Sequence, residues 1–151
     1  MTAKQYLNQV RYLNAKINSK LLQLQSLRAL AEKMVGSINE RVQSSPANTF
    51  AEAVSKIADM ENEINKDIDR LLILKKEIIS EIDRIPNNIY ASILSDRYIS
   101  NRTWEEIAEG IGYEERQIRR MHGKALQLFE KTYNSKLKRC PEMSDNVRKC
   151  P

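Results

Sequence analysis

The sequence is poor in the residues that interrupt helices, with 4 glycines and 4 prolines among 151 residues. These two residues are the least favourable in a helix interior, so long stretches without them favour helix. Aromatic residues make up only 6% of the chain, whereas charged residues reach 30%. This composition is typical of long amphipathic helices rather than of one large compact core. The sequence therefore predicts an all-α fold.

Long hydrophobic runs and cysteine are also scarce. No stretch approaches the ~20 apolar residues that span a bilayer, and the N-terminus has no apolar signal-peptide core. We therefore expect a cytoplasmic protein without a membrane partner. Cys140 and Cys150 each precede a proline in a polar segment, and in a reducing compartment we expect free thiols. His122 is the single histidine, so the four ligands of a zinc site are not available, and no metal or cofactor is expected.

Patterns of catalysis are missing too. The sequence has no glycine-rich phosphate loop and no convincing pairing of a cysteine nucleophile with histidine. The acidic residues of 52–83 fall mostly on the solvent-facing side of a predicted helix. There they stand three or four residues from lysines and arginines, which is the spacing of solvated ion pairs. We therefore expect a protein that is not an enzyme.

The most informative stretch covers residues 103–126. Thr103 followed by Glu106 is the pattern of a capping box, in which each side chain bonds the backbone N–H of the other residue. A short helix is therefore predicted over 104–109. Gly112 lies in the turn that follows, and glycine adopts the positive φ that such a turn demands. The sequence thus predicts a short capped helix, a tight turn and a second helix.

The second helix is predicted to begin at about Glu114 and to cross the first steeply. A steep crossing requires small or apolar residues where the two helices approach each other. These positions are filled by Ile107, Ala108, Ile111, Gly112, Tyr113, Ile118 and Met121. An ordinary helical hairpin is the alternative, but its turn would rarely meet all of these demands together. We therefore predict a helix-turn-helix unit.

Basic and amide side chains occupy the outward face of the second helix. Arginine and glutamine read guanine and adenine edges in the major groove, and lysine neutralises phosphate. A solvated basic face is the alternative, and the preceding glycine turn favours DNA reading. Glu114 and Glu115 suit the positive end of the helix dipole but would repel a phosphate docked there. Arg102, in the connector before the first helix, is a further candidate. The candidate DNA-binding residues are therefore Arg102, Arg116, Gln117, Arg119, Arg120 and Lys124.

The first 85 residues are predicted to form a long antiparallel hairpin with coiled-coil packing. Apolar residues recur at alternating three- and four-residue steps in one helix from Lys4 to about Val42 and in a second from Phe50 to about Ile85. Residues 43–48 are predicted to form the loop. The predicted contact positions include Val10, Ile17, Leu24 and Ala31 of the first helix, and Val54, Ile57, Ile64, Ile68 and Leu71 of the second.

Some apolar residues of the hairpin fall outside these contact positions. Residues 4–85 are therefore a candidate surface for self-association or for a protein partner. The residues concerned are Leu22, Leu30, Val35, Leu72 and Leu74. The second helix of the hairpin is expected to start behind a second capping box, made by Thr49 and Glu52.

Pro86 ends the hairpin, because proline cannot continue the hydrogen-bond ladder of a helix. Asn87 or Asn88 should then cap a support helix over 89–99. We expect Trp104 to anchor the core rather than to act as a wedge between bases. The helix after the glycine turn is expected to reach about Tyr133. The net charge of +5 divides into +2 over residues 1–85, zero over 86–133 and +3 over 134–151, and the last segment is predicted to be a disordered basic tail.

These residues also carry a family resemblance. Residues 98–129 resemble the fourth region of sigma-seventy factors, with matches at Glu106-Ile107-Ala108, Gly112, Arg116-Gln117-Ile118-Arg119-Arg120 and Lys124-Ala125-Leu126. Over residues 1–133, including Thr2-Ala3-Lys4-Gln5-Tyr6-Leu7 and Arg97-Tyr98, the chain is similar to a family of small phage and prophage proteins of Gram-positive bacteria. That family is described as sigma-like transcription regulators. The resemblance implies a bacterial host cytoplasm, double-stranded DNA as partner and RNA polymerase as a candidate partner.

The sequence therefore predicts three parts: a coiled-coil helical hairpin over 1–85, a helix-turn-helix domain like sigma region four over 86–133, and the tail over 134–151. The predicted function is sequence-specific DNA binding in transcription regulation, with the helix at 114–133 in the major groove. The alternative is a phage packaging or assembly module, resembling the small terminase subunit, that binds protein through its coiled coil. Small terminase subunits usually place the DNA-binding unit first, which is the reverse of the order here.

Overall fold

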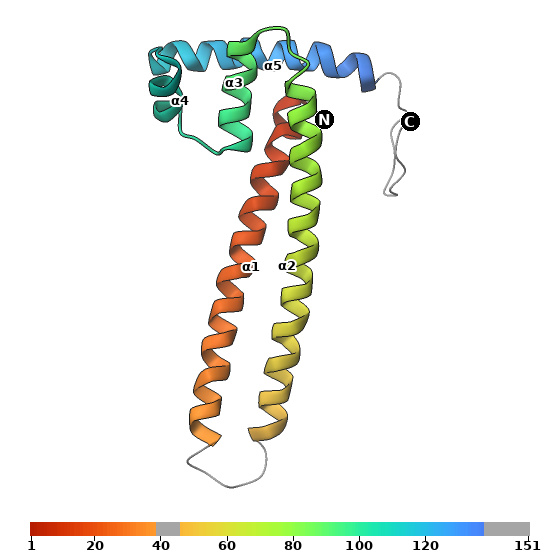
Figure 1. The fold of residues 1–151 in the computed structure, drawn as a ribbon, viewed down its shortest axis with the longest axis vertical. Coiled ribbons are helices and arrows are strands. Elements are labelled where there is room, and N and C mark those ends of the chain that lie inside the picture. The colour runs from red at the N-terminus through yellow and green to blue at the C-terminus, as the bar shows by residue number, and fades with distance from the viewer. Residues whose placement is uncertain (39–45, 138–151) are drawn as a thin grey trace. The chain divides into compact units, whose positions relative to one another are not determined.

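The computed structural model describes residues 1–38 and 46–137, and every regular element in them is helical (Figure 1). The prediction of an all-α fold is confirmed. None of the described helices is long and apolar enough to cross a membrane. In chain order the elements are α1 (Ala3–Ile38), α2 (Pro46–Ile82), α3 (Asn88–Leu94), the π-helical segment η1 (Ser95–Ile99), α4 (Trp104–Ile111) and α5 (Glu115–Leu137).

Two helix ends differ from the prediction. The tail was expected from residue 134, but α5 continues to Leu137, so residues 134–137 are helical. Cys140 and Cys150 lie outside the described residues. The second hairpin helix was expected to begin at Phe50, whereas α2 begins at Pro46. Proline is well placed in the first turn of a helix, because the N–H that it lacks would have no intrahelical partner there.

The start of α1 has a capping box that the sequence analysis missed. The Thr2 backbone N–H donates to Gln5 Oε1 over 2.8 Å, and the Gln5 backbone N–H donates to Thr2 Oγ1 over 3.3 Å. The two side chains thus satisfy two N–H groups that a helix terminus leaves unpaired. This local pattern fixes the beginning of α1 at Ala3, one residue before the predicted Lys4.

Contacts divide the chain into two compact units. The hairpin unit comprises Tyr12–Ile73. The terminal unit comprises Met1–Arg11 and the chain from Leu74 onward. The predicted boundary after residue 85 falls inside the terminal unit, so the end of α2 belongs with the helices that follow it. Beyond α2, the Ile85 N–H donates to the Ile82 carbonyl over 3.0 Å, and Pro86 comes directly afterwards.

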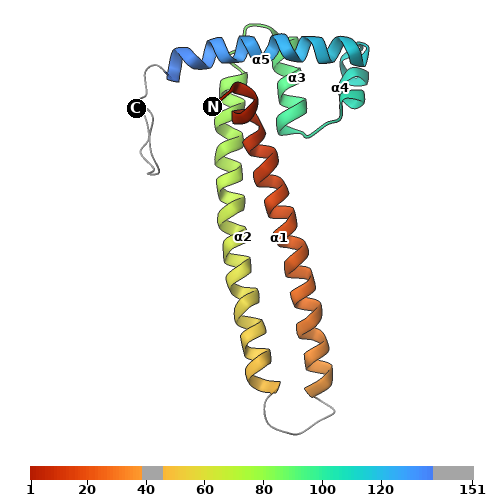
Figure 2. The same cartoon turned by 180° about the vertical axis from the view of Figure 1, so that it is seen from behind.

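In the hairpin unit, α1 and α2 lie side by side in opposite directions (Figures 1 and 2). Buried apolar residues recur every seven positions on α1, at Ile17, Leu24 and Ala31, as its spacing predicts. The apolar face of α2 is shifted from the predicted one. Val54 is 47% exposed while its neighbour Ala53 is buried, so the prediction for Val54 is wrong. Further along α2, Asp67 is buried, whereas its neighbour Ile68 is only partly buried.

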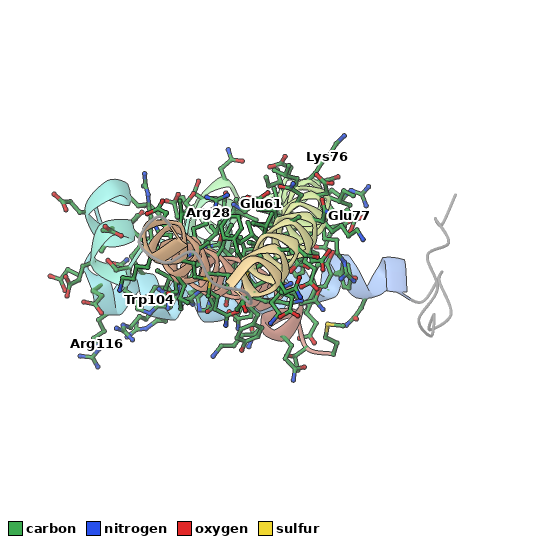
Figure 3. All side chains as sticks on the ribbon, turned by 90° about the horizontal axis from the view of Figure 1, so that it is seen from below. Arg28, Glu61, Lys76, Glu77, Trp104 and Arg116 are labelled. Carbon is green, nitrogen blue, oxygen red and sulfur yellow. The ribbon has the colours of Figure 1, made fainter. Side chains whose placement is uncertain are left out.

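Asp67 is a charged residue within this apolar face, with only 5% of its surface exposed. Lys20 Nζ lies 2.7 Å from Asp67 Oδ2, and Lys16 Nζ lies 3.5 Å from the same atom. The hydrogen bond from Lys20 holds the pKa of the Asp67 carboxyl below its usual range. Further along the two helices, Arg28 pairs with Glu61, and both side chains are more exposed than that of Asp67 (Figure 3). A buried charge that needs its partner can fix the register between two helices.

Replacing Lys20 with methionine should destabilise the hairpin unit at neutral pH, because the Asp67 carboxylate loses its nearest cation. Adding Asp67→Leu should recover most of that loss. Since the folded-state pKa of Asp67 is lowered, its stabilisation is present above the ordinary pKa of 3.8 and is lost as the pH falls through the lowered value. Urea denaturation followed by circular dichroism, at neutral and at acid pH, measures both effects.

Arg28→Met is the matched control for the Lys20 variant, since exposed ion pairs contribute little to stability. We expect its effect to be several-fold smaller than that of Lys20→Met. A double variant no more stable than Lys20→Met alone would show that the buried pair does not act as a unit.

The terminal unit has its own core where α3, α4 and α5 meet. Ile93, Ile107, Ala108 and Ile118 are buried together there. In Figures 1 and 2, α5 lies across α3 and across the first turns of α1. The Tyr6 ring of α1 stacks on the rings of two α5 residues, with centroids 6.2 Å from Phe129 and 4.7 Å from Tyr133. The aromatic contacts thus join the beginning of the described chain to its last helix.

The support helix before α4 is capped as predicted but is not regular throughout. Asn87 Oδ1 accepts hydrogen bonds from the backbone N–H groups of Ile89 and Tyr90. The predicted single helix over 89–99 changes at Ser95 into the π-helical segment η1, where the Ser100 N–H reaches back five residues to the Ser95 carbonyl over 3.1 Å. The wider turn shifts the angular positions of the side chains that follow, in comparison with an α-helix.

Candidate nucleic-acid interface

The turn between α4 and α5 is built by local sequence. Thr103 Oγ1 accepts from the Glu106 N–H over 3.3 Å, and the Thr103 N–H donates to Glu106 Oε2 over 2.8 Å, which confirms the predicted capping box. The helix then extends to Ile111, two residues further than expected. Gly112 has φ of 83°, in the left-handed region, and its N–H donates to the Ala108 carbonyl over 2.9 Å. Glycine adopts this conformation without the strain of a side chain.

One residue predicted to pack at this turn does not. Tyr113 is 37% exposed, and its backbone, rather than its ring, is tied down, since its N–H donates to the Ala108 carbonyl over 3.1 Å. The turn residue therefore contributes less to the core than its apolar ring suggested. Ile107, Ala108 and Ile118 are buried as the spacing predicts, and Ile111 and Met121 pack against them.

α5 has one buried and one exposed face. The buried residues recur at steps of four, three and four, which is the spacing of a single helix face. They are Ile118, His122, Ala125 and Phe129. On the remaining surface of the helix, four of the candidate DNA-binding residues are exposed: Arg116, Gln117, Arg120 and Lys124. Figure 3 shows the Arg116 side chain extending away from the helices.

Two other candidate residues are held by carboxylates. Arg119 donates from Nε and from one terminal nitrogen to Glu115 Oε1, over 2.8 and 2.5 Å. Arg102 lies 3.7 Å from Asp96 Oδ2, and its backbone N–H donates to the Asp96 carbonyl over 2.9 Å. Both side chains keep about half of their surface exposed. Their charges are therefore partly compensated, whereas the ion pairs among the described residues include none with Arg116, Arg120 or Lys124.

An aromatic and basic cluster beside α5 was missed by sequence reasoning. The guanidinium carbon of Arg97 lies 4.4 Å from the centre of the Trp104 ring, and that of Arg119 lies 5.4 Å from it. Trp104 is half-buried and packs against the core of the terminal unit, in the position expected of a core anchor. Arg97 and Arg119 are far apart in the sequence and lie on different elements, so no local spacing could have paired them.

His122 closes this cluster on its buried side. Its Nε2 lies 2.9 Å from the Tyr98 hydroxyl, and its ring meets Trp104 edge-on with centroids 4.8 Å apart. Burial lowers the pKa of His122 to about 4, and the positive charges of Lys4 and Arg97 act in the same direction. The imidazole is therefore neutral at pH 7 and adds no charge to α5.

The chemistry offered by this surface is that of guanidinium, ammonium and amide donors. In the described ranges, no group of three or more histidine, cysteine, aspartate or glutamate side chains is arranged to hold a metal ion.

The chain matches no protein-family model, and no curated protein or solved structure is significantly similar to it. The donors on this surface therefore determine what it can bind.

Donors of this kind suit polyanions. Arginine and lysine bind phosphate oxygens, and arginine and glutamine also form paired hydrogen bonds with base edges. A helix that carries them on its outer face, and is anchored by the opposite face, can present them together to a nucleic-acid groove.

Proposed function

We propose that the protein is a sequence-specific DNA-binding transcriptional regulator of phage or prophage type, in which α4 and α5 form a helix-turn-helix and α5 enters the major groove. The observation that carries this proposal is the position of Arg116, Gln117, Arg120 and Lys124, all exposed on α5 away from its buried face. A recognition helix in the major groove presents a few side chains to base edges, while its other face packs on the supporting helices.

Charge along α5 supports the same proposal. Glu114 and Glu115 stand at its beginning, while the basic residues follow from Arg116 onward. The acidic end would repel a phosphate, so the proposed contact uses the middle of the helix rather than its N-terminus. Few phosphates can be neutralised by so few cations, and we therefore expect modest, salt-sensitive non-specific affinity.

We also propose a protein interface on residues 4–85, for a second copy of the chain or for RNA polymerase. Four of the side chains expected to remain outside the helix contact are indeed exposed, namely Leu22, Leu30, Val35 and Leu72, whereas Leu74 is half-buried. A contiguous exposed apolar patch is typical of surfaces that bind other proteins, and in this proposal these side chains supply its apolar contacts. A palindromic DNA site would favour the second copy, because a two-fold dimer reads two half-sites.

Recovery of genomic DNA fragments bound to the purified full-length protein, at two salt concentrations, tests the proposal. One enriched motif that survives the higher salt supports a specific regulator. Unselective binding that disappears with salt contradicts it, because a purely electrostatic contact with phosphates behaves in this way.

Arg120→Ala should weaken binding to the enriched site by ~1 to 3 kcal/mol and relax the preference at one base pair, whereas Lys124→Ala should weaken all sequences alike. Fluorescence anisotropy with the site and with single-base variants measures both effects. Arg70→Ala and Lys76→Ala are the charge-matched controls, since both residues are exposed on α2 and do not belong to the proposed DNA-reading face of α5. Equal and small losses for Arg120→Ala and Lys124→Ala would contradict base reading by α5.

A further inference from the structure

Three arginines from distant parts of the sequence converge in the terminal unit. Arg97 of η1 and Arg119 of α5 both have guanidinium groups over the Trp104 ring, at 4.4 and 5.4 Å from its centre. Arg11 of α1 is the third, and its positive charge acts on both Arg97 and Tyr98. No element holds two of these arginines, so the cluster exists only because α1, η1 and α5 pack together.

This gathering of like charges is only partly compensated. Burial lowers the pKa of Arg97, and the positive charges of Arg11 and Arg119 lower it further. Arg119 has a carboxylate partner in Glu115, but the ion pairs among the described residues provide none for Arg11 or Arg97. The hydrogen bond of Arg97 goes to a neutral acceptor, the Arg102 carbonyl, over 3.0 Å. An anion bound beside Arg97 would relieve the repulsion that Arg11 and Arg119 exert on its guanidinium group.

The geometry points to a phosphate-binding site formed by Arg11, Arg97 and Arg119 beside Trp104. We propose that its occupant is a phosphodiester group of the DNA strand that flanks the bases read by α5. The guanidinium group is planar and carries several donors, which suits phosphate oxygens. The identity of the occupant as DNA rests on the proposed function, whereas the presence of a phosphate site does not.

The position of the cluster explains why DNA would use it. Arg119 lies on α5 directly beside Arg120, so a strand in contact with the exposed face of α5 passes near the cluster. Glu114 and Glu115 disfavour phosphate at the end of α5 where a helix would otherwise attract it. The cluster supplies that missing contact from α1 and η1, at Arg11 and Arg97, neither of which was among the residues predicted from sequence.

Trp104 makes the site measurable, because it is the single tryptophan of the chain and two of the arginines lie over it. In a titration of the full-length protein with inorganic phosphate, at ionic strength held constant with chloride, we expect a saturable change in tryptophan fluorescence. The change should be lost in Arg97→Gln and in Arg11→Gln and retained in the control Arg70→Gln. Circular dichroism of each variant establishes that it is folded, and Arg11→Gln leaves the Trp104 stacking in place if Arg97→Gln does not fold.

Salt dependence of DNA binding identifies the occupant. Loss of one phosphate contact should reduce the slope of log K against log salt by ~0.9 in Arg11→Gln and in Arg97→Gln, with the sequence preference unchanged. A saturable phosphate signal that is lost in the variants, in a protein that binds no DNA, would keep the site and refute the proposed function. Specific DNA binding with unchanged slopes would refute the phosphodiester occupant. Absence of a saturable signal, or its survival in the variants, would refute the site.

Discussion

Replacing Phe129 with alanine should destabilise the terminal unit by about 3 to 5 kcal/mol. Phe129 has 1% of its surface exposed, and its ring packs against those of Tyr6 and Tyr133, at centroid distances of 6.2 and 5.7 Å. Truncation removes a large buried surface and leaves a cavity where α5 meets the first turns of α1. The lost aromatic contacts add to that cost. Urea denaturation followed by Trp104 fluorescence measures it, because Trp104 lies in the same unit.

Tyr12→Ala provides the matched control, since it removes an aromatic ring that is 70% exposed. Its effect on the free energy of unfolding should stay within about 0.5 kcal/mol. Equal effects of the two substitutions would mean that the contact between α1 and α5 adds nothing to the stability of the terminal unit. In that case the DNA affinity should also be insensitive to Phe129, because α5 would not depend on α1 for its position.

Local signals in the sequence were sufficient for part of the fold. The capping box of Thr103 with Glu106 and the turn at Gly112 depend on residues within a few positions of one another, so their spacing reveals them. The buried face of α1 was equally accessible, because its apolar residues leave one consistent stripe. Predictions of this kind need no knowledge of a partner element.

The contact face of α2 needed such knowledge. Two overlapping stripes share Ile57, Ile64 and Leu71, and hydrophobicity alone favours Val54 over Ala53 and Ile68 over Asp67. In the structure, α2 instead buries Ala53 and Asp67, because Lys16 and Lys20 of α1 supply the cations that a buried Asp67 requires. The sequence of one helix cannot contain that information.

The sequence likewise predicts only part of the candidate site. Exposure of Arg116, Gln117, Arg120 and Lys124 follows from helical periodicity, and the structure agrees with it. The cluster around Trp104 depends on a π-helical segment and on contacts between α1, η1 and α5. His122 was predicted only as a residue of α5, and its burial against Tyr98 follows from the same packing.

His122 should make the terminal unit sensitive to mild acid. The folded protein holds the pKa of His122 at about 4, below the ordinary value of 6.5 that applies in the unfolded chain. As the pH falls, the unfolded state therefore takes up a proton first. The stability contribution is complete above pH 6.5 and is lost progressively between pH 6.5 and pH 4. The loss should be on the order of 2 kcal/mol, which is less than the full difference between the two pKa values would give, because solvent screens part of the interaction.

His122→Gln should remove this sensitivity, because an amide can keep a hydrogen bond to the Tyr98 hydroxyl but does not titrate. The difference in stability between the variant and the unmodified protein should shift by about 2 kcal/mol in favour of the variant when the pH is lowered from about 7 to about 4. Comparison at equal pH cancels the acid response of the carboxylates. Gln127→His, an exposed residue of the same helix, is the control and should change little with pH, since an exposed imidazole has the same pKa in both states. Parallel pH profiles for His122→Gln and the unmodified protein would show that His122 is protonated equally in the folded and unfolded states, and its proposed neutrality beside Arg97 would then fail.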